Sequence, residues 1–179
     1  MITKILNAIT LSRILCAILI YLILYLENNY SIALVLFFIA SFSDFLDGYL
    51  ARKTNSVSVL GEILDPIADK LLIVFVLIGL SINLDSFLIG FVSAVIISRE
   101  IWVAALRDIN SRNNQSEKTR VTFLAKTKTA IQMLSILMYL FGLTINNMIF
   151  LFFADIILII ALLVTIQTGF QYTISAFKK

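Results

Sequence analysis

Apolar residues occur in six long runs along the chain, and polar segments separate these runs. The runs lie at residues 8–27, 31–52, 64–82, 85–107, 126–144 and 147–174. Each is close to the length of about 20 residues that a helix needs to cross a hydrocarbon layer of ~30 Å. The only proline, Pro66, lies near the start of the third run, where its missing N–H is tolerated. The pattern predicts an all-α protein with six transmembrane helices in a single domain over residues 1–179.

Composition supports a membrane protein and narrows the chemistry. Hydrophobic residues make up 60% of the chain and charged residues 14%, against about 45–50% and about 25% in a typical soluble domain. These values exclude an ordinary soluble domain and a disordered chain. The sequence contains no His and one Cys, which excludes a Ser–His–Asp triad and a Cys- or His-based metal site. Any catalysis must therefore use carboxylates, Lys, Arg and hydroxyl groups.

The basic residues predict the orientation in the membrane. If the helices alternate in direction, all 14 Lys and Arg fall on, or toward, the side that holds the N-terminus. The opposite connections carry only the acidic residues Glu27 and Asp85. Because Lys and Arg are enriched in cytoplasmic connections, this side is predicted to be cytoplasmic. The chain is thus predicted to be a polytopic integral membrane protein with both termini in the cytoplasm.

Four carboxylates form two pairs near the predicted cytoplasmic side. Asp44 and Asp47 are three residues apart, and Asp65 and Asp69 are four apart, so each pair lies on one helix face. The connection between the second and third runs has only about ten residues, so we expect these helices to be antiparallel neighbours with converging acidic faces. A hard divalent cation such as Mg²⁺ or Mn²⁺ would offset their mutual repulsion. The simpler alternative is a solvated helix end.

These residues belong to a longer pattern, Asp44-x2-Asp47-Gly48-x2-Ala51-Arg52-x8-Gly61-x3-Asp65-x3-Asp69. It resembles the signature of the CDP-alcohol phosphatidyltransferases. The resemblance implies six transmembrane helices, a homodimer, and transfer of a phosphatidyl group from CDP-diacylglycerol to an alcohol with release of CMP. It also implies a divalent-metal site, Mg²⁺ or Mn²⁺, at Asp44, Asp47, Asp65 and Asp69, with Asp69 as the catalytic base.

The resemblance extends to residues that would bind the CDP-lipid. It assigns Gly48, Arg52, Gly61 and Asp44 to this role. The N-terminal segment Asn7-x2-Thr10-x2-Arg13 also resembles a family motif and adds Thr10 and Arg13, although Leu6 stands where the family usually has Pro. Without the motif, Arg13 could equally be a membrane anchor whose charge reaches the interface.

A second group of basic residues suggests the acceptor. Arg99 and Arg107 are eight residues apart on the fourth run and share a face, and Lys126 and Lys128 begin the fifth run. Basic side chains near a carboxylate site suit an acceptor that carries a phosphate. The segments Arg99-Glu100-x6-Arg107 and Lys126-x-Lys128-Thr129 resemble the branch of the family that uses sn-glycerol 3-phosphate, the bacterial phosphatidylglycerophosphate synthases. Ala125 stands where that branch often has Gly.

The resemblance places the chain in the bacterial inner membrane with its active site facing the cytoplasm. Cardiolipin synthases of the same fold and the enzymes that use inositol phosphate or serine share the core motif, so they stay open as alternatives. An alternative of another class is an ion-coupled transporter that uses the carboxylates as an ion site. Transporter sites favour the middle of the bilayer and internal repeats, whereas these carboxylates lie near one face.

Overall fold

Six helices run back and forth across the molecule. The computed structural model describes residues 2–54, 59–113, 117 and 123–177, and within this part the side chains of residues 7–43, 61, 63–113, 117, 124–125 and 127–177. The helices are α1 (Ile2–Leu26), α2 (Tyr30–Thr54), α3 (Val59–Asn83), α4 (Phe87–Arg112), α5 (Phe123–Thr144) and α6 (Met148–Phe177). The six predicted helices are therefore confirmed as helices.

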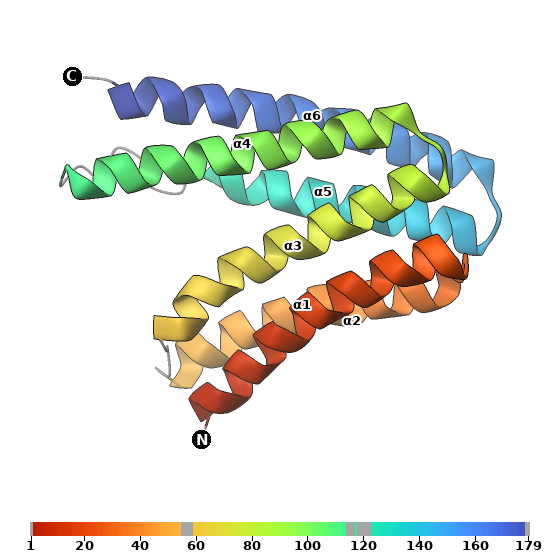
Figure 1. The fold of residues 1–179 in the computed structure, drawn as a ribbon, viewed down its shortest axis with the longest axis horizontal. Helices are drawn as coiled ribbons and strands as arrows, with labels where there is room; N and C mark the ends of the chain where they lie inside the picture. The colour runs from red at the N-terminus through yellow and green to blue at the C-terminus, as the bar shows by residue number, and fades with distance from the viewer. Residues whose placement is uncertain (1, 55–58, 114–116, 118–122, 178–179) are drawn as a thin grey trace.

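The helices form two groups that meet at one end. α1 packs against α2 and α3, and α6 packs against α4 and α5, while contacts of α3 with α4 and of α2 with α5 join the groups. Figure 1 shows the groups close together near the three short connections and farther apart near the opposite end. Both termini lie at that opposite end, together with the last turns of α2 and α4 and the first turns of α3 and α5.

The short α1–α2, α3–α4 and α5–α6 connections share one backbone conformation. Asn28, Asp85 and Asn146 have positive φ angles of 53°, 47° and 51°, a conformation that Asn and Asp tolerate better than most residues. The chain then bonds back to the helix it has left, as when Ser86 N–H donates to the Ser81 carbonyl at 3.0 Å. Residues of this kind commonly end helices, so the polar breaks in the sequence do mark tight reversals.

Two details differ from the sequence predictions. α3 begins at Val59, so Pro66 lies inside the helix rather than at its first turn. α3 ends at Asn83, one residue beyond the predicted run, and Asn83 is hydrogen-bonded to residues of α1, α2 and their connection. Its amide donates to the Leu24 carbonyl at 2.7 Å and to Asn28 Oδ1, and it accepts from Tyr30 Oη at 2.9 Å.

The predicted convergence of the acidic faces of the second and third helices stays a prediction, because the side chains of Asp44 and Asp47 lie outside the described residues. The helix pairs that pack extensively within the described part of the chain do not include α2 with α3. Both helices instead pack against α1. Among the described residues, α1 thus lies against both helices, and the N-terminal motif lies beside Asp65 and Asp69.

The outer surface is apolar, as expected in a membrane. Large hydrophobic side chains such as Leu15, Phe153 and Leu163 are about half or more exposed. Soluble proteins rarely expose this much apolar surface. In the described part of the chain, Asn7–Leu26, Phe87–Arg112 and Met148–Phe177 are long and apolar enough to cross a membrane. The apolar segment Tyr30–Ser43 is shorter. The fold is that of an all-helical membrane protein.

Candidate functional site

Two residues of α1 contact the two described carboxylates of α3. Thr10 Oγ1 donates to Asp65 Oδ1 at 2.7 Å, and Arg13 Nη1 donates to Asp69 Oδ1 at 3.0 Å. The Arg13 side chain is fully buried. A buried charge is costly unless it is paired and hydrogen-bonded, so the Arg13–Asp69 ion pair fixes the position of α1 against α3. It also fixes the direction of the Asp69 carboxylate.

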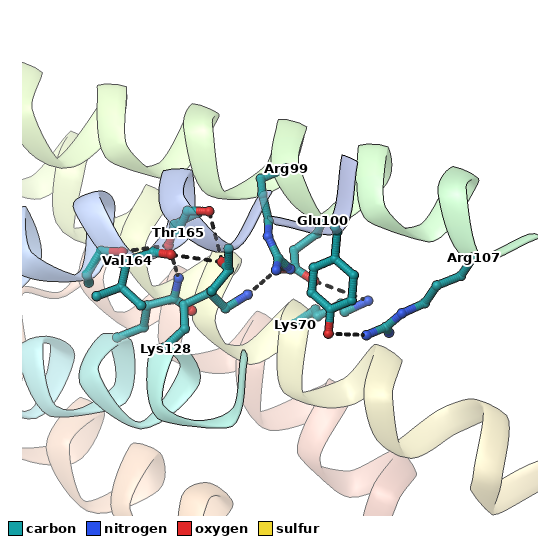
Figure 2. Close-up of polar contacts among 11 residues, drawn as sticks. Lys70, Arg99, Glu100, Arg107, Lys128, Val164 and Thr165 are labelled. Atoms are coloured by element: carbon teal, nitrogen blue, oxygen red, sulfur yellow. Dashed lines mark hydrogen bonds and ion pairs between the residues drawn. The ribbon is translucent and has the colours of Figure 1, made fainter. Parts of the chain in front are cut away.

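Glu100 is the centre of a second polar cluster, which joins three helices. Its carboxylate accepts from Arg99 Nη1 at 2.9 Å and from Lys128 Nζ, and it lies 3.4 Å from Lys70 Nζ. Figure 2 shows Arg99 and Lys128 directed toward Glu100, with Lys70 close by. Three cations thus surround one carboxylate, and this excess of positive charge favours an anionic ligand.

A cavity of about 180 Å³ lies between α3, α4 and α5 and connects the two clusters. Its lining consists of Pro66, Asp69, Lys70, Ile73, Val74, Ile96, Glu100, Lys128, Thr129 and Gln132. Asp69 therefore shares one cavity with Lys70 and Lys128. A small polar molecule in this cavity would meet two carboxylates, two ammonium groups, an amide and a hydroxyl, which can bind both the hydroxyl and the phosphate of a hydroxylated phosphate.

Arg99 and Arg107 converge on α6. Their guanidinium carbons lie 5.3 Å and 5.1 Å from the centroid of the Tyr172 ring, and Arg107 Nη2 donates to Tyr172 Oη at 3.1 Å. The expected shared face of the two arginines is thereby confirmed. Figure 2 places Arg107 farther along α4 than Arg99 and Glu100. Neither arginine lines the cavity that holds Asp69.

The structure places some predicted site residues but not others. Thr10, Arg13, Asp65 and Asp69 are together, and Lys128 joins them across the cavity. Gly61 lies one helical turn before Asp65 on α3. The side chains, or for glycine the surroundings, of the following predicted residues lie outside the described part of the chain: Asp44, Asp47, Gly48, Arg52 and Lys126.

Sequence reasoning missed four residues that the structure brings to this region. Lys70 and Glu100 are ionisable residues inside apolar helices, and such residues mark functional sites often enough to have been considered. Gln132 lines the cavity and donates to Thr165 Oγ1 at 3.1 Å. Tyr172 carries no charge and is one of several polar residues near the end of α6, so only the fold reveals its contact with the two arginines.

Comparison with known proteins identifies the class. A sequence profile described as CDP-alcohol phosphatidyltransferase matches residues 4–167. The chain belongs to the CDP-alcohol phosphatidyltransferase family, which confirms the resemblance seen in the Asp motif and makes the chain an enzyme rather than an ion-coupled transporter.

Individual relatives share one name, CDP-diacylglycerol–glycerol-3-phosphate 3-phosphatidyltransferase. The protein from Rickettsia bellii is 39% identical over 169 residues, which cover 93% of this chain and 91% of the relative. The protein from Haemophilus influenzae is 37% identical over 148 residues, covering 82% and 78%. The Escherichia coli protein is 31% identical over 130 residues, covering 72% and 71%.

The cluster around Glu100 predicts a specific stability effect. Glu100→Gln would leave three cations without their shared counter-charge, and breaking a buried ion pair in this way costs about 3–5 kcal/mol. We expect a clearly lower thermal unfolding midpoint of the detergent-solubilised protein, measured by intrinsic fluorescence.

Asp108→Asn is the matched control for this variant, because it also converts an α4 carboxylate to an amide. Asp108 pairs with Arg112 at 2.8 Å, but both side chains are more than half exposed. Exposed pairs contribute about 0–1 kcal/mol, so the midpoint should hardly move. Equal midpoints for the two variants would show that Glu100 does not hold the helices together.

Proposed function

We propose that the enzyme transfers the phosphatidyl group of CDP-diacylglycerol to sn-glycerol 3-phosphate and produces phosphatidylglycerophosphate and CMP. The observation that carries this proposal is the cavity that Asp69 shares with Lys70 and Lys128. A carboxylate can accept a hydroxyl proton, and ammonium groups attract a phosphate. The names of the relatives support the same donor and the same acceptor.

The proposal includes the position of the protein in the membrane. All six helices would cross the bacterial inner membrane, with both termini and the cavity toward the cytoplasm. The basic residues and the common location of the termini support this orientation. The lipid tails would enter sideways from the bilayer, and the polar acceptor would enter from the cytoplasm. The homodimer stays a prediction from the resemblance.

Asp44, Asp47, Asp65 and Asp69 would hold a divalent cation, Mg²⁺ or Mn²⁺. Asp65 and Asp69 fit this role, because they are one turn apart on α3 and α1 fixes one oxygen of each. Partners of this kind commonly orient metal ligands, and an all-carboxylate set suits a hard cation. When bound, the cation would neutralise charge on the pyrophosphate oxygens of the CDP-lipid. Gly48, Arg52 and Gly61 would contact that lipid.

Asp69 would act as the general base. The acceptor hydroxyl attacks the phosphorus that carries the diacylglycerol, the bond from this phosphorus to the CMP oxygen breaks, and CMP leaves with the bonding electrons. The hydroxyl proton passes to Asp69, whose carboxylate Arg13 holds in a fixed direction. Thr10 and Arg13, predicted to bind the CDP-lipid, would act on it through the carboxylates that they orient.

The basic residues would bind the acceptor phosphate. Lys128 lines the cavity, and Lys126 lies in the first turn of the same helix. Arg99 pairs with Glu100, which lines the cavity, and Arg107 lies farther along α4. Serine has no phosphate for these cations to bind. A phosphate-bearing acceptor is therefore favoured over serine, while phosphatidylglycerol and inositol phosphate are the competing acceptors to test.

A direct assay tests the proposal. Purified enzyme, CDP-diacylglycerol and Mg²⁺ should release CMP with sn-glycerol 3-phosphate, and the labelled acceptor should appear in the lipid fraction. Parallel reactions contain phosphatidylglycerol, serine or inositol phosphate. Turnover with phosphatidylglycerol alone would establish a cardiolipin synthase and refute the proposed acceptor.

Asp69→Asn should abolish turnover, because an amide cannot accept the hydroxyl proton. We expect a loss of at least about 100-fold in kcat, within the range for a general base, with binding of the CDP-lipid retained. Asp155→Asn is the matched control, because Asp155 lies on α6 and accepts from Tyr139 instead of lining the cavity. It should keep most of the activity. Substantial turnover by the Asp69 variant would rule out its role as the base.

A further inference from the structure

Tyr172 lies on the inward-facing side of α6, where it contacts Arg99 and Arg107 of α4. The buried residues of α6 follow one another at intervals of three and four: Ala154, Leu158, Ala161, Thr165, Thr168 and Tyr172. Arg99 belongs to the corresponding buried series of α4. Tyr172 is 3% exposed. Its ring therefore lies inside the helix packing, where both guanidinium groups contact it.

A cation over an aromatic face is attracted to the ring, more strongly where water is excluded. Tyr172 supplies this contact to both Arg99 and Arg107, and its hydroxyl accepts from Arg107 at 3.1 Å. Arg99 Nη1 also donates a hydrogen bond to Glu100 Oε1 at 2.9 Å. The two guanidinium groups are therefore held in place from α6 before any ligand arrives.

Several donors of these arginines remain available. Nε and Nη2 of Arg99 and Nε of Arg107 are buried and have no hydrogen-bond partner among the described residues. Buried N–H groups are expensive to leave unpaired, and guanidinium groups match phosphate oxygens in geometry. An anion bound between the two side chains would satisfy these donors.

Gly169 provides the space for this arrangement. A Cβ atom at this position would lie 3.2 Å from Cγ of Arg99, closer than ordinary van der Waals contact. The stem of Arg99 thus passes directly over the α6 backbone, and any larger residue would displace it. Gly169 and Tyr172 are three residues apart on α6, and both follow residue 167, where the family match ends.

We propose that Gly169 and Tyr172 are positioning residues that hold Arg99 and Arg107 in the geometry required to bind the acceptor phosphate. Gly169 admits the stem of Arg99, and Tyr172 holds both guanidinium groups. This inference rests on the proposed function, because it assigns the two arginines to the phosphate of the acceptor. It adds the last turns of α6 to a site otherwise built from α1 to α5.

Steady-state kinetics of Tyr172 variants test the inference. Tyr172→Leu removes the ring and should raise KM for sn-glycerol 3-phosphate about 10-fold or more, with kcat and KM for CDP-diacylglycerol changed less than about twofold. Tyr172→Phe keeps the ring and should raise the acceptor KM only about threefold. Phe170→Leu is the matched control, since Phe170 is an exposed aromatic residue of the same helix, and it should leave all three constants unchanged.

Gly169→Ala separates positioning from folding. Alanine favours a helix over glycine, so the thermal unfolding midpoint should not fall, yet the displaced Arg99 should raise the acceptor KM severalfold. An unchanged acceptor KM in both Tyr172→Leu and Gly169→Ala would overturn the inference while the proposed function stands. A fall in kcat together with a rise in KM for both substrates would also overturn it, because that pattern indicates a general structural role. If the unmodified enzyme releases no CMP with sn-glycerol 3-phosphate, the proposed function itself fails and this assignment fails with it.

Discussion

The cost of an unpaired charge among apolar helices is the constraint on which this structure depends. Arg13 is fully buried in α1, and Asp69 of α3 is its partner at 3.0 Å. Glu100 of α4 is surrounded by Arg99 of its own helix, Lys70 of α3 and Lys128 of α5. Lipid tails give helices little hydrophobic reason to associate, so these contacts determine which helices meet at the predicted cytoplasmic end.

The same contacts shape the chemistry. Each of the two carboxylates that line the cavity has a fixed direction because a cation from another helix holds it: Arg13 holds Asp69, and Lys128 holds Glu100. Three cations surround the single carboxylate of Glu100, and two of them, Lys70 and Lys128, line the cavity, where they would attract the phosphate of the proposed acceptor. Preorganised charges of this kind need no rearrangement during the reaction. In the proposed function, Asp69 would meet the reacting hydroxyl of the acceptor, and Lys70 and Lys128 would meet its phosphate.

The sequence predicted the framework well, for physical reasons. Six apolar runs of membrane-spanning length have few alternatives to helices, and the Asn-rich breaks became turns in which Asn28, Asp85 and Asn146 adopt positive φ. The spacing of Asp65 and Asp69 placed them on one face, and the family identity followed from the Asp motif. The sequence did not reveal that α1 contacts both carboxylates, because neighbours in space depend on packing between helices. For the same reason the sequence did not reveal that α2 packs against α1 and α5, and Tyr172 carries no charge that would have singled it out.

The central claim is that the cavity beside Asp69 receives the phosphorylated acceptor. Thr129 lines this cavity, and Cys16 is the only cysteine, so a Thr129→Cys variant in a Cys16→Ser background carries a single reporter thiol. The rate of its alkylation can be followed by mass spectrometry, with Ser111→Cys at the exposed end of α4 as the control position. The account predicts that sn-glycerol 3-phosphate slows alkylation at position 129 but not at position 111. An unchanged rate at position 129 under saturating acceptor would contradict it.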